Sequence, residues 1–270
     1  MSVERNKVIS TLDLGDGILA RRYSSAPLGY YKEFTFPLFV DLIDLAGPKL
    51  RILDVGAGCG HFESYYFSNR PNSNVNFVLI DSSYTLLELA EKKLGGMGIV
   101  IEAYQRSFNS LDWVKGLGSF DIIISHNSLF HLTPEKVSAF YNNCFDLLKD
   151  NGAILNQQSF KPTLLKTRFK LFYSVFGPQY YHSADEHAGI VKYEHESELI
   201  EAGHKMLFDS EIKKLQFQGW KRDCSTPFAS LQYSIDDHLE FMQSAGFTAD
   251  CIWKMMHFGL LSGLKGDIFN

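Results

Sequence analysis

The amino-acid sequence predicts an α/β fold in which helices cover both faces of a doubly wound, mostly parallel sheet. Two observations support this prediction. Apolar stretches of strand length alternate with stretches of helical periodicity through the first 160 residues or so. A glycine-rich turn follows the first of these strands, and an acid ends the second. Ligands of such sheets bind outside the carboxyl ends of the strands, so the turn and the acid are expected to share one edge.

The first predicted strand, Leu50 to Val55, leads into three glycines at alternate positions, which are Gly56, Gly58 and Gly60. Glycine leaves no Cβ in a turn that a ligand must approach closely. Asp81 follows about twenty residues later, at the end of the strand predicted from Val75 to Ile80, where an acid is placed to hold two ribose hydroxyls. The pattern predicts a nucleoside-cofactor site.

The remaining elements follow from hydrophobic periodicity and turn residues. Helices are predicted over Phe36 to Leu45, Phe62 to Phe67, Tyr84 to Leu94, Pro134 to Leu148 and Ile235 to Met242. Strands are predicted over Ile99 to Tyr104, Phe120 to Ser125 and Ala153 to Asn156, with the last strands between Cys251 and Leu261. A turn at Asp150-Asn151-Gly152 is expected to precede the strand that starts at Ala153, and Gly246 is expected to stop the last helix.

Composition indicates a single enzyme-sized unit, because 270 residues with 45% hydrophobic side chains can bury one large core. A net charge of −5 provides no long-range attraction for nucleic acid, so a nucleic-acid partner is disfavoured. The sequence shows neither a signal-peptide pattern nor an apolar run of membrane-spanning length, so we expect a cytoplasmic protein with no membrane partner. The 4 cysteines are scattered, which indicates neither a disulfide framework nor a zinc site.

Several of these segments resemble the class I S-adenosylmethionine (SAM) dependent methyltransferases, particularly their small-molecule branch. The segments are Ile52 to Gly60, Leu79 to Ser83, Phe120 to Leu132, Leu147 to Ala153 and Ala245 to Trp253. The resemblance covers residues 48 to 158 and 230 to 266. It implies a Rossmann-like sheet of seven strands with an antiparallel carboxyl-terminal hairpin, SAM as cofactor and S-adenosylhomocysteine (SAH) as product. Nicotinamide enzymes usually carry Gly-x-Gly-x-x-Gly instead, and here the third glycine comes one residue early.

The resemblance also implies a cofactor site assembled from the ends of four strands. Its members are Asp54, Gly56, Ala57, Gly58, Gly60, Asp81, Ser82, Ser107, Phe108, His126 and Asn127. The glycines would admit the methionine end of SAM, Asp54 would order the loop, and Asp81 would bind the ribose. Ser107 and Phe108 stand where the family often has an acid for the adenine amino group, so Phe108 either flanks the adenine or belongs to the core. His126 and Asn127 would lie nearest the methyl group, with a backbone carbonyl holding the SAM amine.

Methyl transfer is an in-line displacement at an activated carbon, so positioning supplies most of the acceleration, and a base is needed only when the acceptor must lose a proton. Three residues are candidates for catalysis. His131 follows the fourth strand and matches a histidine common in the small-molecule branch, although it is also suited to capping the loop before Thr133. His182 lies in a polar loop with His187, whose spacing fits no zinc motif, and we predict no metal site. Tyr31 lies in an aromatic segment before the first helix.

Three regions are expected. Residues 1–47 form an amino-terminal helical arm, residues 48–160 and 229–270 form the SAM-binding core, and residues 161–228 form a helical insertion above the cofactor edge. A lid of this kind excludes water from the reactive sulfonium. The aromatic share of 14%, concentrated in the arm and insertion, indicates an apolar or aromatic acceptor, or else packing and a homodimer interface. Gln157 and Gln158 are expected either to face this cleft together and bind a polar group of the acceptor, or to lie in water.

The sequence therefore predicts a SAM-dependent methyltransferase that acts on a small, apolar or aromatic molecule. Three alternatives stay open at this point. The same cofactor also supports non-methylating chemistry such as cyclisation or decarboxylation. A basic face built from lysines and arginines of the insertion would favour an RNA substrate. A closed acceptor cleft would indicate a non-catalytic SAM-binding regulatory module.

Overall fold

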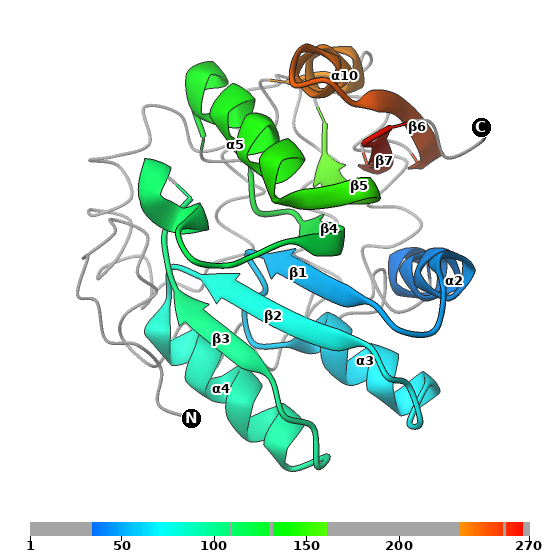
Figure 1. The fold of residues 1–270 in the computed structure, drawn as a ribbon, viewed down its shortest axis with the longest axis vertical. Coiled ribbons are helices and arrows are strands. Elements are labelled where there is room, and N and C mark those ends of the chain that lie inside the picture. Colours follow the sequence, from blue (N-terminus) through cyan, green and yellow to red (C-terminus); the bar gives the residue numbers. More distant parts are fainter. Residues whose placement is uncertain (1–33, 109, 130–131, 161–232, 256–257, 267–270) are drawn as a thin grey trace, which may run out of the picture.

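A computed structural model describes residues 34–108, 110–129, 132–160, 233–255 and 258–266 of the chain. The predicted insertion and all but the last 14 residues (34–47) of the predicted arm lie outside these ranges. The described part forms a sheet with helices on both faces (Figure 1). In that part, we find no helix with both the length and the apolar character needed to cross a bilayer.

Seven strands form one sheet in the order β3-β2-β1-β4-β5-β7-β6. The strands are β1 (Arg51–Val55), β2 (Asn76–Asp81), β3 (Glu102–Gln105), β4 (Phe120–His126), β5 (Leu148–Ser159), β6 (Thr248–Met255) and β7 (Phe258–Leu264). The first five pair in parallel, whereas β7 runs antiparallel to both β5 and β6. The predicted doubly wound sheet with an antiparallel carboxyl-terminal hairpin is confirmed. Its order reverses between β1 and β4, the point at which such sheets bind ligands.

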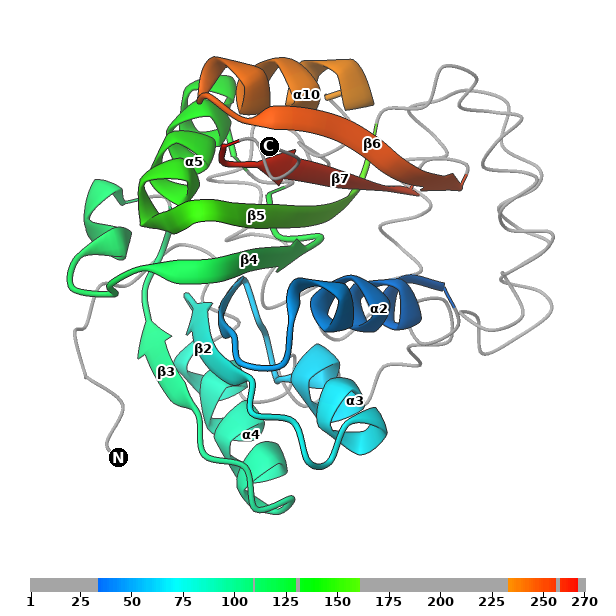
Figure 2. The same ribbon diagram turned by 45° about the vertical axis from the view of Figure 1, so that its right-hand side comes forward.

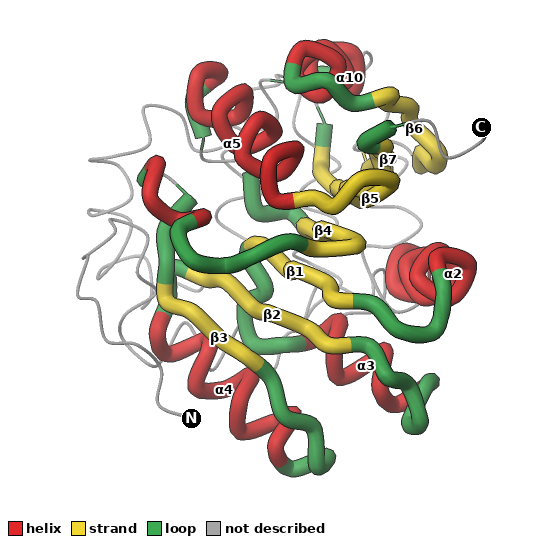
Figure 3. The backbone as a smooth tube through the Cα atoms, in the orientation of Figure 1, coloured by secondary structure: helices red, strands yellow, loops and turns green. Residues whose placement is uncertain are grey.

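The helices divide between the two faces, as Figures 1 and 2 show. They are α2 (Phe36–Ala46), α3 (His61–Asn69), α4 (Tyr84–Gly95), a short 3-10 helix η2 (Leu111–Val114), α5 (Pro134–Leu147) and α10 (Ile235–Ser244). The side chains of α2, α3 and α4 pack in one core cluster, and those of α5 and α10 pack in the other. Figure 3 shows how short loops connect most of these elements. All five predicted helices are present.

Local sequence explains where these helices begin. Ser83 caps α4 by accepting a hydrogen bond from the Leu86 amide at 3.3 Å. Ser234 and Asp237 form a reciprocal capping box at the start of α10. Pro134 occupies the first turn of α5, where its missing N–H has no partner to lose.

The alternation of side chains along β1 decides which residues face which helices. Leu53 and Val55 belong to the cluster beneath α5 and α10, whereas Ile52 belongs to the cluster beneath α2, α3 and α4. Asp54 shares the parity of Ile52, so its side chain points toward the face that α3 covers. A carboxylate is thereby placed inside an otherwise apolar layer.

Strand β5 differs from the prediction because it starts at Leu148, directly after α5, with no separate turn before it. The segment predicted as a turn, Asp150-Asn151-Gly152, is hydrogen-bonded to the residue that follows β7. The Asn151 amide donates to the Lys265 carbonyl, and the Lys265 amide donates to the Gly152 carbonyl, both at 2.9 Å. Asn151 takes a positive φ of 64°, and the pairing of β4 with β5 shifts register at this point. The turn residues therefore make a bulge inside a longer strand.

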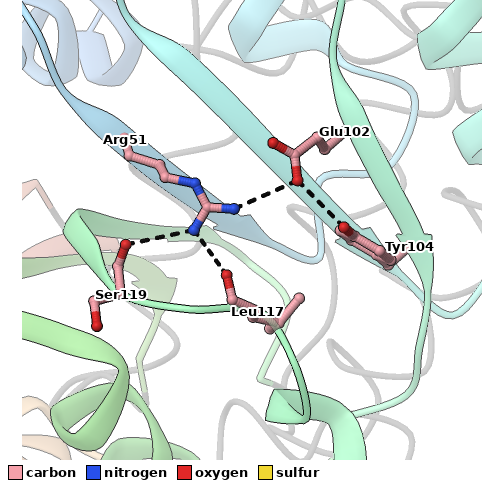
Figure 4. Close-up of polar contacts among 5 residues, drawn as sticks. All are labelled: Arg51, Glu102, Tyr104, Leu117 and Ser119. Carbon is pink, nitrogen blue, oxygen red and sulfur yellow. Dashed lines mark hydrogen bonds and ion pairs between the residues drawn. The ribbon is translucent and has the colours of Figure 1, made fainter. Parts of the chain in front are cut away.

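The amino ends of β1, β3 and β4 are tied together by Arg51 (Figure 4). Its Nη1 donates to the carbonyls of Leu117 at 2.7 Å and Ser119 at 3.4 Å, and its Nη2 pairs with Glu102 at 3.4 Å. The guanidinium also lies 4.4 Å from the centre of the Phe120 ring. Both terminal nitrogens of this side chain thus have protein partners.

Candidate functional site

The glycine-rich turn is tied to the end of β2 by its own backbone. The amides of Gly56 and Ala57 donate to the Ile80 carbonyl at 2.8 and 3.1 Å. The Gly58 amide donates to Asp81 Oδ2 at 2.9 Å. The loop after β1 and the acid at the tip of β2 therefore form one hydrogen-bonded unit.

Gly56 and Gly60 are needed for packing as well as for the turn. Gly56 has a φ of +81°, and a Cβ there would overlap the Ser128 side chain, whose Oγ donates to the Val55 carbonyl at 3.0 Å. Gly60, with a φ of +66°, precedes α3, and a Cβ there would lie 3.1 Å from the Ala90 Cβ on α4. These packing reasons were not visible in the sequence, which indicated only ligand approach.

Asp81 lies at the tip of β2 and holds two backbone amides. Its Oδ1 accepts from the Ser83 amide at 2.8 Å, while Oδ2 accepts from Gly58. A carboxylate oxygen can accept two hydrogen bonds, and the binding of ribose hydroxyls by Asp81 stays a prediction. Ser82 lies next to it, where its carbonyl accepts from Gln105 Nε2 at 3.2 Å. The structure thus adds a loop-positioning role to the residue that the sequence indicated for ribose.

The segment after β3 lies beside Asp81, because the Arg106 amide donates to the Asp81 carbonyl at 3.0 Å. The Ser107 side chain is partly buried there. Phe108 is 8% exposed, and its ring packs edge-to-face against Phe140 at 6.0 Å. Of the two interpretations of Phe108, the structure supports the core position, and a contact with adenine stays a prediction.

Asp54 has a buried neighbour that the sequence interpretation missed. The Asp54 side chain is 2% exposed, and Glu63 of α3 is fully buried beside it. Burial raises the pKa of both carboxyls, and the mutual repulsion of the two raises that of Asp54 further. Glu63 shares a helical stripe with Tyr66 and Phe67, so an acid in an apolar stripe was the available signal.

His126 ends β4 inside an aromatic cage. Its ring centre lies 4.2 Å from that of Phe39, 5.1 Å from that of Phe62 and 5.5 Å from that of Phe36. Burial lowers the pKa of His126 to about 3, so the imidazole is neutral near physiological pH. Its Nε2 is buried and finds no hydrogen-bond partner in the part of the chain that the structure describes. The next residue, Asn127, has a positive φ of 48°, and its amide donates to the Gln157 carbonyl at 2.8 Å.

Gln157 and Gln158 do not face a common cleft, as the sequence interpretation expected, because consecutive strand residues point to opposite faces. Both side chains are at most 1% exposed, which also excludes the expectation that they lie in water. Gln158 Nε2 donates to Asn156 Oδ1 at 2.8 Å, and Asn156 Nδ2 donates to the Tyr141 hydroxyl at 2.6 Å. That hydroxyl also lies 2.8 Å from His238 Nδ1.

Gln157 lies on the other face of β5, paired in register with His126. Among the described residues, neither its side-chain oxygen nor its nitrogen has a hydrogen-bond partner, although Gln157 is fully buried. Three unpartnered polar atoms, from His126 and Gln157, therefore belong to adjacent strand ends. Buried polar atoms of this kind are costly unless a ligand or water satisfies them.

The catalytic candidates Tyr31, His131 and His182 all lie outside the described residues. Across the described ranges, histidines, cysteines and acids form no group suited to a metal ion. The described edge combines a glycine turn, an acid at the next strand tip and two buried acids beside the loop. These donor and acceptor types fit a positively charged nucleoside such as SAM.

Comparison with known families agrees with this geometry. Residues 52–152 match a family described as the methyltransferase domain. This range contains β1 from its second residue on, together with β2, β3, β4 and the glycine turn. The predicted resemblance to methyltransferases is confirmed for this segment, and with it the expectation of SAM as the cofactor.

Similarity to individual proteins extends beyond that segment. A highly reducing polyketide synthase of Strobilurus tenacellus is 26% identical over 147 residues, which is 53% of this chain and 5% of that protein. An O-methyltransferase of Nostoc punctiforme superposes with a TM-score of 0.57 at 12% identity, over 92% of this chain and 59% of the other. Human N-acetylserotonin methyltransferase, solved with SAM, gives 0.54 at 14% identity, over 93% and 57%. The chain spans less than two thirds of each of these proteins, and at such identities the superpositions confirm the fold.

Proposed function

We propose that this chain, whose residues 52–152 form a methyltransferase domain, transfers a methyl group from SAM to a small molecule. The observation that carries the proposal is the joining of the glycine turn to Asp81 at the switch point of the sheet. A turn without Cβ atoms, held against an acid at the next strand tip, suits the methionine and ribose parts of one ligand.

The residues fit SAM in three parts. The turn from Gly56 to Gly58 would hold the methionine end, Asp81 the ribose hydroxyls, and Ser107 the neighbourhood of the adenine. SAM supplies an activated methyl group when bound. The protein's task is then to hold the acceptor in line and to exclude water.

His126 is placed near this edge but is a poor general base. A pKa of about 3 means that it takes up a proton weakly at neutral pH, where effective bases have pKa values near the working pH. If the acceptor must lose a proton, Tyr31, His131 and His182 are the candidates in our proposal. Acceptors that need no base are equally compatible with positioning alone.

The acceptor is proposed to be a largely apolar or aromatic small molecule with one polar group. Support comes from the aromatic rings of Phe36, Phe39 and Phe62, which surround His126, and from the unpartnered amide of Gln157 beside it. An amide that both donates and accepts suits a hydroxyl or a carbonyl group. Residues 161–228 are proposed as the lid of this site, and self-association as a homodimer is part of the same proposal.

The test is calorimetric titration with SAM and SAH, comparing the wild type with Asp81→Ala. Loss of two charge-assisted hydrogen bonds is expected to cost about 3 kcal/mol, or roughly 100-fold in affinity. Asp44→Ala is the matched control, because it removes an exposed ion pair with Arg70 on the outer end of α2.

Micromolar binding by the wild type and by Asp44→Ala, with much weaker binding by Asp81→Ala, would support the proposal and justify a screen of acceptors. No binding by the wild type would contradict it. Binding without transfer to any acceptor would favour a regulatory module or non-methylating chemistry, and strongly salt-dependent RNA binding would favour an RNA substrate.

A further inference from the structure

Two carboxyl groups are buried together beside the cofactor turn. Asp54 comes from β1, directly before the turn, and Glu63 comes from the first turns of α3, directly after it. Their side chains are 2% and 0% exposed. Within the described residues, Asp54 Oδ1 and both Glu63 oxygens have no hydrogen-bond partner of good geometry, although the backbone amide of Glu63 stabilises the Glu63 carboxylate. The two carboxyls therefore have mainly each other as polar neighbours.

The charges that face this pair come from two further positions. Asp81, at the tip of β2, adds negative charge next to Asp54. Lys93 of α4 attracts Glu63, but its Nζ lies 3.2 Å from His61 Nδ1 and 3.7 Å from Cys59 Sγ. The Lys93 ammonium thus attracts Glu63, while Asp54 has Glu63 and Asp81 as charged neighbours. Two adjacent carboxylates cannot both stay ionised in a buried site without further positive charge.

We propose that Asp54 and Glu63 share one proton in the cofactor-free protein and release it when SAM binds, so that Glu63 favours SAM over SAH. The inference rests on the proposed function, because it needs the cofactor site to be the turn beside Asp54. Glu63 is a positioning residue in this scheme, since it acts through Asp54.

The chemistry of the two cofactors explains the preference. SAM carries a sulfonium and an ammonium against one carboxylate, whereas SAH has lost the sulfonium charge. The added positive charge of SAM stabilises the doubly ionised pair. The O–H bond of the shared proton breaks, the proton passes to the solvent, and no bond to the cofactor forms. Loss of the methyl group then restores the conditions for taking the proton back.

Burial is the main reason that the cofactor-free pair keeps its proton. It raises the pKa of Asp54 and of Glu63, and repulsion from Glu63 and Asp81 raises that of Asp54 further. Lys93 acts in the opposite direction on Glu63. The Lys93 contacts with His61 and Cys59 divide its hydrogen-bonding capacity among several partners.

The first measurement needs no cofactor. Infrared spectroscopy of the free protein should show the C=O band of a protonated carboxylic acid at neutral pH. The band should be absent from Glu63→Gln, where the Gln amide can donate to an ionised Asp54, and should persist in Glu88→Gln, which changes an exposed acid of α4. A wild-type spectrum without the band would overturn the shared proton.

The second measurement counts protons. Calorimetric titration in two buffers of different ionisation enthalpy should show release of about one proton per SAM by the wild type, and less on binding SAH. Glu63→Gln should release no proton on binding SAM, and its preference for SAM over SAH should be about tenfold lower than that of the wild type. Equal release by the wild type and by Glu63→Gln would overturn the proposal. If Glu63→Gln fails to fold, disappearance of the wild-type infrared band on adding SAM decides the question.

Failure of this inference and failure of the proposed function give different results. If the band is present but SAM does not bind, the proposed function is wrong, and the coupling to SAM falls with it. If SAM binds without proton release, the proposed function stands and the inference is wrong.

Discussion

The two ends of β1 differ in whether the polar groups buried there have hydrogen-bond partners. At the amino end, Arg51 is held by two carbonyls, one carboxylate and an aromatic ring, and its amide donates to Asp121 Oδ2 at 2.8 Å (Figure 4). Only three residues further on, Asp54 is buried against Glu63, and no described residue provides a donor for its Oδ1. Within the described residues, β1 thus runs from an amino edge where polar groups have partners to a carboxyl edge where several buried polar atoms have none.

The neighbouring strands repeat this contrast. Asp121, near the amino end of β4, is paired with Lys149 at 2.8 Å. His126, at the carboxyl end of the same strand, has an unpartnered Nε2, and the adjacent Gln157 has two unpartnered atoms. Unsatisfied buried groups reduce stability, so their concentration at one edge indicates a region shaped for ligands. The opposite edge holds the sheet together.

The largest effect is expected from Gly56→Ala at the carboxyl edge. A side chain there must adopt a φ of +81° and also displace Ser128, so we expect a loss of about 3 kcal/mol or more in the free energy of unfolding. Gly98→Ala is the matched control, because its φ of +77° is similar and nothing lies within 4 Å of the added Cβ. That control should lose only about 1 kcal/mol. If denaturant unfolding shows the same loss of unfolding free energy for both variants, the Ser128 side chain moves aside at little cost.

A smaller effect is expected from Arg51→Met at the amino edge. The substitution removes the contacts to Leu117, Ser119 and Glu102, and we expect a loss of about 2 kcal/mol in stability. SAM affinity should stay unchanged, because this end of the strand carries no part of the proposed site. Unfolding and calorimetric titration of the same preparation test both statements. A large fall in SAM affinity would contradict the assignment of the cofactor site to the carboxyl edge alone.

The smallest change in stability is expected from Gln157→Leu. Replacing an amide with two unpartnered atoms by an apolar group should leave stability unchanged or raise it by up to about 1 kcal/mol. Gln158→Leu, one residue further on, should instead cost about 1 kcal/mol, because Asn156 Oδ1 loses its donor. Methyl transfer should fall in Gln157→Leu once an acceptor is known. A clear loss of stability in Gln157→Leu would show that its amide is satisfied within the fold.

Much of the cofactor edge could be predicted because its signals are local. The glycines of the turn and Asp81 follow directly after apolar strands, and the order of elements along the chain implies the parallel sheet. Glu63 was missed because a single acid in a short helix is normally assigned to solvent. Its burial depends on the packing of α3 against the sheet, and the acid in an apolar stripe of the helix indicates that packing only indirectly.

The glutamines near the carboxyl end of β5 show a similar limit. Their position at a strand end was clear from the sequence, but the faces to which they point depend on the register of β5 with its neighbours. That register includes a bulge at Asn151, where the sequence indicated a separate turn. One residue of register decides which of Gln157 and Gln158 joins the Tyr141 network.

By itself, the sequence determined the alternation of elements, the glycine turn and the acid that holds it. These features depend on residue type at fixed spacing, and short-range sterics and hydrogen bonding are enough to interpret them. Only the tertiary structure decided that Asp54 meets Glu63 and that His126 lies among phenylalanines from two helices. Such encounters join residues of different elements, and their energies depend on burial, which arises only when the layers pack together.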